Sequence, residues 1–179
     1  NRPTGLCVLN GLTAETFLAY TDEEIIRKAE ATKPTVVAID APLSLPAGRK
    51  SIEERTNVHL RACDKELLKR GIKFFPITLG PMRKLTERGI LLRRILERKH
   101  FKVIEVYPGA AQDILKIPRK QHGLSKLREG LERQGIKGLN DDMTDHELDA
   151  VTCALVGKLF LEGKAETYGT SEQAIIMPK

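Results

Sequence analysis

Tryptophan is absent from this chain, and aromatic residues make up only 4% of its 179 positions. A surface that binds nucleic acid mainly by stacking bases on aromatic side chains is therefore disfavoured. Cysteine is also scarce, because Cys7, Cys63 and Cys153 are the only three, and they lie far apart. This odd, scattered set fits neither a disulfide framework nor paired zinc ligands, and it favours a reduced, cytoplasmic setting.

Long apolar runs are missing as well. No stretch reaches the length needed to cross a bilayer, and no secretory signal peptide is recognisable, so we expect no membrane partner. Glycine-rich phosphate loops of the Walker or dinucleotide-binding type are absent too. The remaining composition, 41% hydrophobic and 30% charged residues, is typical of a globular protein, and the length indicates one domain over residues 1–179. The sequence leaves open a homodimer.

Charge is distributed unevenly along the chain. Residues 69–137 hold 18 Lys/Arg and 6 Asp/Glu, a net charge of +12, whereas the remaining residues hold 12 and 18, a net charge of −6. A basic segment beside an acidic one suits a polyanionic substrate held close to metal ions. A solvated helix face is the plainer explanation of the same basic segment.

The order of the predicted elements indicates an α/β fold. Apolar and β-branched runs predict strands over 5–9, 15–20, 35–40, 101–107 and 174–178. Amphipathic or fully apolar patterns predict helices over 21–32, 58–70, 82–98, 109–115, 123–133 and 144–161. Capping boxes begin the first and last of these helices, at Thr21 and Thr144. The Asn10-Gly11 pair predicts a hairpin turn between the first two strands.

Asp40 ends a run in which residues 36–39 are apolar without interruption. Such a strand is typically buried on both faces of a sheet, and open α/β sheets place ligands at the carboxyl ends of their strands. Glu105 takes a similar position near the end of the strand predicted over 101–107. Asp40 also has a structural alternative, because an Asp can hydrogen-bond the turn that follows it.

Asp149 lies within the predicted helix 144–161, which is apolar almost all round. An ionised carboxylate there costs several kcal/mol unless it is paired or binds a metal ion. Asp145 and His146 lie on the same face of the helix, and each could add a metal ligand or a proton-transfer group. Asp145 has a plainer explanation, since an acid in the first turn opposes the helix dipole.

Together these acids predict a carboxylate site for Mg²⁺ or Mn²⁺. The expected metal ligands are Asp40, Glu105, Asp145 and Asp149, and the expected catalytic groups are Asp40, Glu105, Asp149 and His146. Two such ions roughly 4 Å apart can stabilise both the attacking and the leaving oxygen of a phosphoryl displacement. Basic residues of the helix predicted over 82–98 would hold a nucleic-acid backbone, namely Arg83, Lys84, Arg94 and Arg98.

Several short motifs, in their order and spacing, resemble those of an uncharacterised family. They are Val-Val-Ala-Ile-Asp40-Ala-Pro42, Arg61-Ala-Cys-Asp64, Lys69-Arg-Gly-Ile-Lys-Phe-Phe-Pro76, Gly80-Pro-Met-Arg-Lys-Leu85, Val103-Ile-Glu-Val-Tyr-Pro108 and His146-Glu-Leu-Asp-Ala150. The family is one of unknown function, described as predicted nucleases with a ribonuclease H-like fold. The resemblance covers most of the chain. It implies a ribonuclease H-like mixed sheet flanked by helices, and a metal-dependent nuclease activity.

By the same analogy, Asp40 corresponds to the acid on the fourth strand of ribonuclease H-like enzymes and Asp149 to the acid of the final helix. Glu105 corresponds to an acid on the fifth strand of some relatives. The first strand of that fold, with its metal-binding Asp, is apparently absent from this chain, so residues 5–9 would form the second strand.

Two other functions stay open. A non-catalytic nucleic-acid binder would need only the basic segment. A nucleotide phosphohydrolase or phosphotransferase on a related fold would be expected to carry phosphate loops, which the sequence lacks. Nothing in the sequence distinguishes DNA from RNA as the partner.

Overall fold

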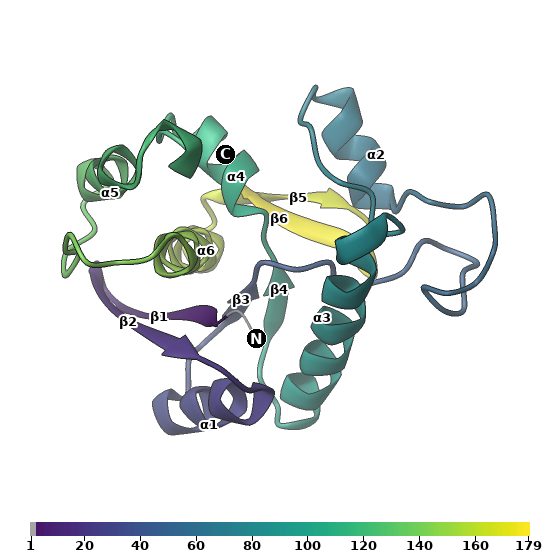
Figure 1. Cartoon of the computed structure of the whole chain (residues 1–179), viewed down its shortest axis with the longest axis horizontal. Helices are drawn as coiled ribbons and strands as arrows, with labels where there is room; N and C mark the ends of the chain where they lie inside the picture. The colour runs from purple at the N-terminus through teal and green to yellow at the C-terminus, as the bar shows by residue number, and fades with distance from the viewer. Residues whose placement is uncertain (1–2) are drawn as a thin grey trace.

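The computed structural model describes residues 3–179, and within that range the chain forms a mixed α/β fold with six α-helices and six strands (Figure 1). The strands are β1 (Thr4–Asn10), β2 (Thr13–Ala19), β3 (Val37–Ile39), β4 (Val103–Glu105), β5 (Ala165–Gly169) and β6 (Ala174–Pro178). The helices are α1 (Asp22–Thr32), α2 (Ala62–Lys69), α3 (Gly80–Arg98), α4 (Pro108–Ile114), α5 (Leu124–Arg133) and α6 (Asp145–Leu161), with a short 3₁₀ helix, η1 (Lys120–His122).

The strands pair in three ladders rather than in the single mixed sheet that the sequence led us to expect. β1 runs antiparallel to β2, β3 runs parallel to β4, and β5 runs antiparallel to β6. A single bridge between Val106 and Ile176 links the second ladder to the third. Within residues 3–179, no ladder joins β1 to β3. In the described part of the chain the three ladders therefore do not form one continuous sheet.

The β1–β2 hairpin forms as predicted, but its two-residue loop is Gly11-Leu12, one residue after the predicted Asn10-Gly11 pair. The register pairs Asn10 with Thr13 across a two-residue loop. Gly11 has a φ of 61°, a left-handed conformation that glycine adopts without steric cost and that tight hairpin turns require.

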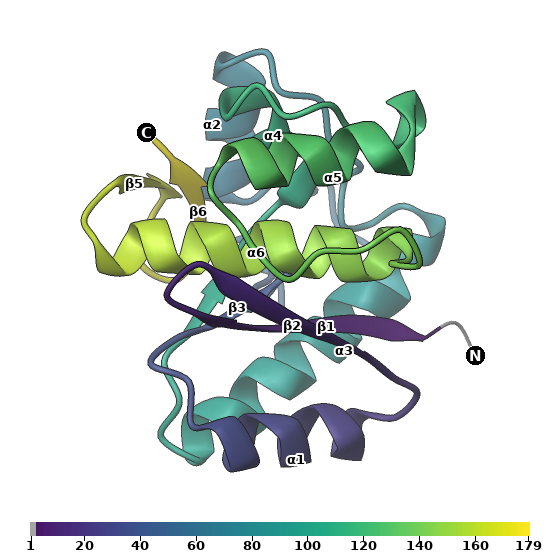
Figure 2. The same cartoon turned by 90° about the vertical axis from the view of Figure 1, so that its left-hand side faces the viewer.

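Helix α6 lies between two hydrophobic cores. Figures 1 and 2 show it between α5 on one side and the β1–β2 hairpin on the other. One core contains Leu148, Val151 and Leu155 of this helix, together with Leu127 and Leu131 of α5. The other core, formed with β4, β6 and α4, contains Cys153 and Val156. Because nearly every side of α6 meets apolar atoms, its sequence is apolar almost all round.

The start of α6 is held by the predicted capping box. The Thr144 hydroxyl accepts from the backbone N–H of Glu147, and the Glu147 carboxylate accepts from the N–H of Thr144. Glu147 also accepts a 2.8 Å hydrogen bond from the Thr16 hydroxyl of β2. Gly5 of β1 passes so close that a Cβ there would lie 2.1 Å from the carbonyl oxygen of His146. The hairpin therefore fixes the position of the first turn of α6.

Two local predictions were wrong. Helix α2 begins at Ala62 rather than at residue 58, because the Asp64 carboxylate accepts from the backbone N–H of Arg61 at 2.9 Å and so caps the helix there. Strand β5 was not predicted, since its sequence Ala-Glu-Thr-Tyr-Gly has only one buried side chain, Tyr168, and lacks the alternation that marks a strand.

Candidate functional site

Asp40 and Glu105 reach the same edge of the β3–β4 ladder. The parallel register places Ile39 beside Glu105, so the residue that follows β3 and the last residue of β4 lie at neighbouring strand ends. This is the edge at which open α/β sheets place their ligands. The structure thus brings the two acids to one edge, and their predicted roles as metal ligands and catalytic groups stay predictions.

Asp40 is exposed to solvent, yet protein surrounds it closely. Loss of hydration raises the pKa of its carboxyl group from the usual 3.8 to about 7. The negative charge of Asp149 raises it further and that of Glu105 adds a smaller rise, whereas the ammonium group of Lys120 acts in the opposite direction. Water that still reaches the carboxylate offsets part of this rise. These couplings bring Asp40, Asp149 and Glu105 into one electrostatic neighbourhood.

Asp149 is held by two side chains that the sequence did not single out. Its Oδ1 accepts a 3.1 Å hydrogen bond from Nε2 of Gln112 on α4. Its Oδ2 lies 2.8 Å from Nζ of Lys120 on η1, and the same Nζ lies 3.0 Å from Oδ2 of Asp145. Asp145 and Asp149 are four residues apart on α6, so their carboxylates meet on one face of the helix, with the lysine ammonium group between them.

Lys120 and Asp145 stabilise each other's charged forms. Partial burial acts to lower the pKa of Lys120, but the hydrogen bonds to Asp149 and Asp145 raise it above its usual value. The hydrogen bond from Lys120 is also the main cause that lowers the pKa of Asp145. We call Asp145, Asp149 and Lys120, with Asp40 beside them, the carboxylate–lysine site.

His146 lies next to this site but does not bond to it. Its Nε2 is 4.0 Å from Oδ1 of Asp145, which is beyond hydrogen-bond length. The side chain is 37% exposed, so it is accessible to solvent and to a bound molecule. Its proposed part in proton transfer stays a prediction.

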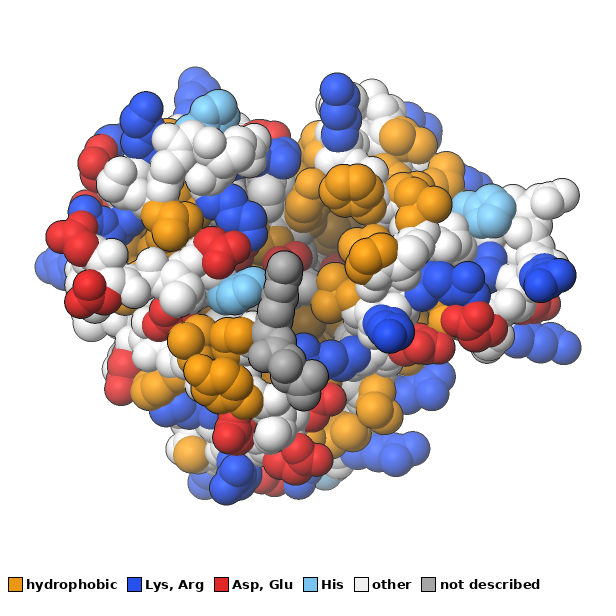
Figure 3. All heavy atoms as spheres, in the orientation of Figure 1, with side chains coloured by type: hydrophobic (Ala, Val, Ile, Leu, Met, Phe, Trp, Pro, Cys, Tyr) orange, Lys and Arg blue, Asp and Glu red, His pale blue; other side chains and the backbone are white. Residues whose placement is uncertain are grey.

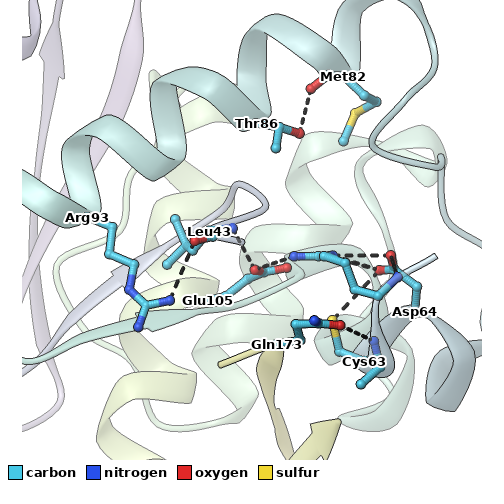
Figure 4. Close-up of polar contacts among 10 residues, drawn as sticks. Leu43, Cys63, Asp64, Met82, Thr86, Arg93, Glu105 and Gln173 are labelled. Atoms are coloured by element: carbon cyan, nitrogen blue, oxygen red, sulfur yellow. Dashed lines mark hydrogen bonds and ion pairs between the residues drawn. The ribbon is translucent and has the colours of Figure 1, made fainter. Parts of the chain in front are cut away.

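Glu105 has a well-defined structural partner. Its Oε2 accepts hydrogen bonds from Nη1 of Arg61 and from the backbone N–H of Leu43, each at 2.7 Å (Figure 4). Arg61 also grips Asp64, with Nη2 2.9 Å from Oδ1. All three charged side chains are at most 4% exposed. Arg61 and Asp64 of the motif Arg61-Ala-Cys-Asp64 therefore form an internal ion pair.

This network changes the interpretation of Glu105. Burial raises the pKa of its carboxyl group, although the Arg61 guanidinium and the Leu43 N–H act to lower it. The network ties the end of β4 to the start of α2 and to the loop after Asp40. Glu105 is therefore explained without a metal ion, and its role as a ligand stays a prediction.

The fit of the site to a divalent cation is partial. Within residues 3–179, no group of three or more His, Cys, Asp or Glu side chains is arranged to hold a metal ion. Mg²⁺, however, is usually held by one or two carboxylates and completed by water and phosphate oxygens. The paired carboxylates of Asp145 and Asp149 meet that requirement, provided that Lys120 moves aside.

The predicted nucleic-acid residues of α3 do not face this site. Gly89 marks the face of α3 that packs on the loop after Asp40, since a Cβ there would lie 2.7 Å from the carbonyl oxygen of Pro42. At 100° per residue, Arg94 and Arg98 point about 140° and about 180° away from that face. The other two predicted residues, Arg83 and Lys84, lie at similarly distant angles, and Arg83 forms an ion pair with Glu53.

Lys120 and Gln112 are the site residues that sequence reasoning missed. Lys120 lies in a basic loop between two helices, and nothing local indicates that it contacts acids 25 and 29 positions later. Gln112 offered a weak signal, because it is a polar residue in the Ala-Ala-Gln-Asp-Ile stretch of α4 and is almost completely buried. A buried amide of this kind requires a partner, and Asp149 is that partner.

The fold and the site thus define a mixed α/β protein whose strand ends and final helix bring carboxylates together with a lysine. Residues 1–174 match the model of a family described as "Protein of unknown function (DUF429)", and the chain belongs to that family. This confirms the expected membership in a family of unknown function. Neither the curated proteins nor the solved structures contain a match to the chain.

Proposed function

We propose that this protein is a metal-dependent nuclease that hydrolyses phosphodiester bonds in DNA or RNA. The observation that carries the proposal is the convergence of Asp40 and Asp149, from a strand end and from a core helix, close enough that the negative charge of Asp149 raises the pKa of Asp40. Proteins retain such like-charged pairs at functional sites more often than elsewhere. A divalent cation relieves this repulsion, and a phosphodiester substrate brings further oxygen ligands.

In this proposal Asp145 and Asp149, with Asp40 near them, would hold Mg²⁺ or Mn²⁺, and the ion would supply polarisation of the phosphoryl group and a bound water of lowered pKa. Gln112 keeps the Asp149 carboxylate in one orientation through its 3.1 Å hydrogen bond. Lys120 neutralises the acids in the absence of a cation and donates to a substrate phosphate once it is displaced. His146, exposed beside Asp145, is positioned to exchange a proton with the substrate.

A ribonuclease H-like fold is part of the same proposal. It is supported by the order hairpin, crossover helix α1, strand β3, helices, parallel strand β4 and buried helix α6. It is also supported by the way α6 covers both the β1–β2 hairpin and the β3–β4 ladder. A continuous sheet would need a further ladder between β1 and β3.

The test is a cleavage assay of the protein with fluorescently labelled DNA, RNA and branched substrates in Mn²⁺. Cleavage should require the metal ion and should be lost in Asp149→Asn. The matched control is Asp142→Asn, which removes an exposed loop carboxylate whose side chain has no part in the site. Absence of metal-dependent cleavage on every substrate would refute the proposal, as would equal activity of the two variants.

A second candidate is a nucleic-acid binder without catalytic activity. One observation favours it, namely that Lys120 already neutralises Asp145 and Asp149 without any metal ion. In that case binding should be as strong in a chelator as in Mn²⁺, and Asp149→Asn should leave binding intact.

A further inference from the structure

A cleft of about 690 Å³ opens beside the carboxylate–lysine site, between the segment after α2 and the segment that joins α4 to α5. Its charged and polar lining consists of Lys73, Lys116, Arg119, Gln121 and His122, with Asp113 as the one acid. In the space-filling view the surface is hollowed between the side that carries α4 and α5 and the side that carries α2 (Figures 1 and 3).

The cleft has uncompensated positive charge. Arg119 is paired with Asp113 through Nε at 2.8 Å and through Nη2. In the described part of the chain, neither Lys73 nor Lys116 has a carboxylate within ion-pair distance. Two unpaired cations facing one cavity repel each other, and a bound anion would remove that repulsion.

The guanidinium of Arg119 is fixed in place rather than free on the surface. Its Nε and Nη2 donate to the Asp113 carboxylate. The third nitrogen, Nη1, packs close to Gly109, since a Cβ there would lie only 3.1 Å away. The guanidinium also lies 5.9 Å from the centre of the Tyr107 ring, and Tyr107 contributes to its raised pKa. A guanidinium held in one orientation is well suited to phosphate oxygens.

The cleft and the carboxylate–lysine site share their walls. On η1, Lys120 bonds to Asp149, while the adjacent residues Arg119 and Gln121 line the cleft. On α4, Gln112 bonds to Asp149, while the next residue, Asp113, lines the cleft. Two separate segments, α4 and the segment around η1, therefore contribute residues both to the cleft and to the partners of Asp149.

We propose that this cleft binds the sugar–phosphate backbone of one nucleic-acid strand and leads it to the carboxylate–lysine site. The assignment rests on the proposed action on nucleic acid, but it places the binding surface away from the basic face of α3. The volume is within the roughly 300–1,000 Å³ of small-ligand sites. A flexible single strand can enter a cavity of this volume, whereas duplex DNA is stiff, with a persistence length of about 50 nm, and cannot bend into it. The exposed His122 ring offers a stacking surface for a base at the cleft wall.

The test measures binding of a short fluorescein-labelled oligothymidylate by anisotropy, in EDTA so that neither metal nor cleavage contributes. The cleft variant is Lys73→Gln/Lys116→Gln, which removes two unpaired charges. The control variant is Arg27→Gln/Lys137→Gln, which removes two exposed charges, one from α1 and one from the segment after α5 that bridges to Thr13 of the hairpin. A third protein, Lys73→Arg/Lys116→Arg, keeps the charge. Thermal melting establishes that all of them fold.

The cleft variant should bind on the order of 10-fold more weakly at 0.1 M salt, and its salt slope should fall by about 1.4, the value for two lost contacts to a single strand. The control and the arginine variant should bind like the wild type. The same glutamine substitutions should leave the binding of a duplex unchanged.

Three results would overturn the inference. Equal weakening in the cleft and control variants would mean that only overall charge matters. Unchanged binding in the cleft variant would place the strand elsewhere and leave the proposed function intact. Failure of the wild type to bind any nucleic acid would remove both the cleft assignment and the proposed function.

Discussion

The ammonium group of Lys120 lies 2.8 Å from the Asp149 carboxylate and bridges it to Asp145. A cation of the protein itself thus occupies the position between two carboxylates that a divalent ion would need. Any metal ion that binds there must first displace the lysine, so the lysine sets part of the affinity of the site.

Lys120→Met should therefore strengthen Mn²⁺ binding several-fold, measured as the midpoint of a thermal-shift titration. Without metal, the variant should melt about 2–4 °C lower, because a pair that is partly exposed contributes about 1 kcal/mol at most. Lys126→Met removes an exposed lysine of α5 and should change neither quantity. An unchanged Mn²⁺ midpoint in Lys120→Met would show that the lysine does not compete with the ion.

The raised pKa of Asp40 predicts that the stability of the protein depends on pH. Its folded-state pKa is raised from 3.8 to about 7 by loss of hydration and by Asp149, so the folded protein binds this proton more tightly than the unfolded chain. Stability therefore falls as pH rises through this window and is constant above it. Asp40→Asn should match the wild type in melting temperature at about pH 4 and exceed it at about pH 8. A variant that is less stable than the wild type at pH 8 would contradict this assignment.

Substitution of Arg61 should cause a large loss of stability. Arg61→Met leaves two buried carboxylates, Asp64 and Glu105, without their counter-charge, and removing one partner of a buried ion pair costs about 3–5 kcal/mol. Urea denaturation measures the change. Lys65→Met alters an exposed residue of α2 and should cost less than about 0.5 kcal/mol.

Glu105 and Asp149 should respond differently to metal. Glu105→Gln keeps an acceptor for the Leu43 N–H but removes a charge that Arg61 already neutralises, so Mn²⁺ stabilisation should persist. In Asp149→Asn it should be lost. If Glu105→Gln also abolished the stabilisation, Glu105 would be a metal ligand, as its position in the sequence suggested.

Two glycines, Gly5 packed against α6 and Gly157 within α6, give a matched pair of predictions. A Cβ at Gly5 would lie 2.1 Å from a backbone oxygen, which cannot move without shifting the helix, so Gly5→Ala should cost about 1–3 kcal/mol or more. A Cβ at Gly157 would lie 3.4 Å from Cγ1 of Val36, which is an ordinary van der Waals contact. Because alanine favours the helix, Gly157→Ala should be neutral or stabilising by up to about 1 kcal/mol. Chemical denaturation of both variants checks the contrast.

The parts of the fold that follow from local chemistry are predictable from the sequence. The capping boxes at Thr21 and Thr144 and the β1–β2 hairpin form as expected, because each depends on residues within a few positions of one another. The buried character of α6 is equally predictable, since a helix that is apolar all round must be enclosed.

The site is predictable only on its acidic side. Asp40 and Asp149 stand out because a carboxylate in an apolar element needs an explanation. The side chains that bind Asp149, Lys120 and Gln112, come from distant segments, and no local pattern indicates where those segments fold. For the same reason Glu105 suggests a ligand in the sequence, while the distant Arg61 provides the ion pair that explains it.

The acids and the lysine of the site differ in how freely they can move, because the first turn of α6 is capped and tightly enclosed. Asp145 and Asp149 belong to α6, which packs in both hydrophobic cores, so they cannot shift without disturbing that packing. Lys120 belongs to a three-residue helical turn flanked by Pro118 and Gly123. Adjustment to an arriving ion or strand must therefore come from the lysine side, and amide exchange should slow there on binding while the acid-bearing helix stays as protected as before.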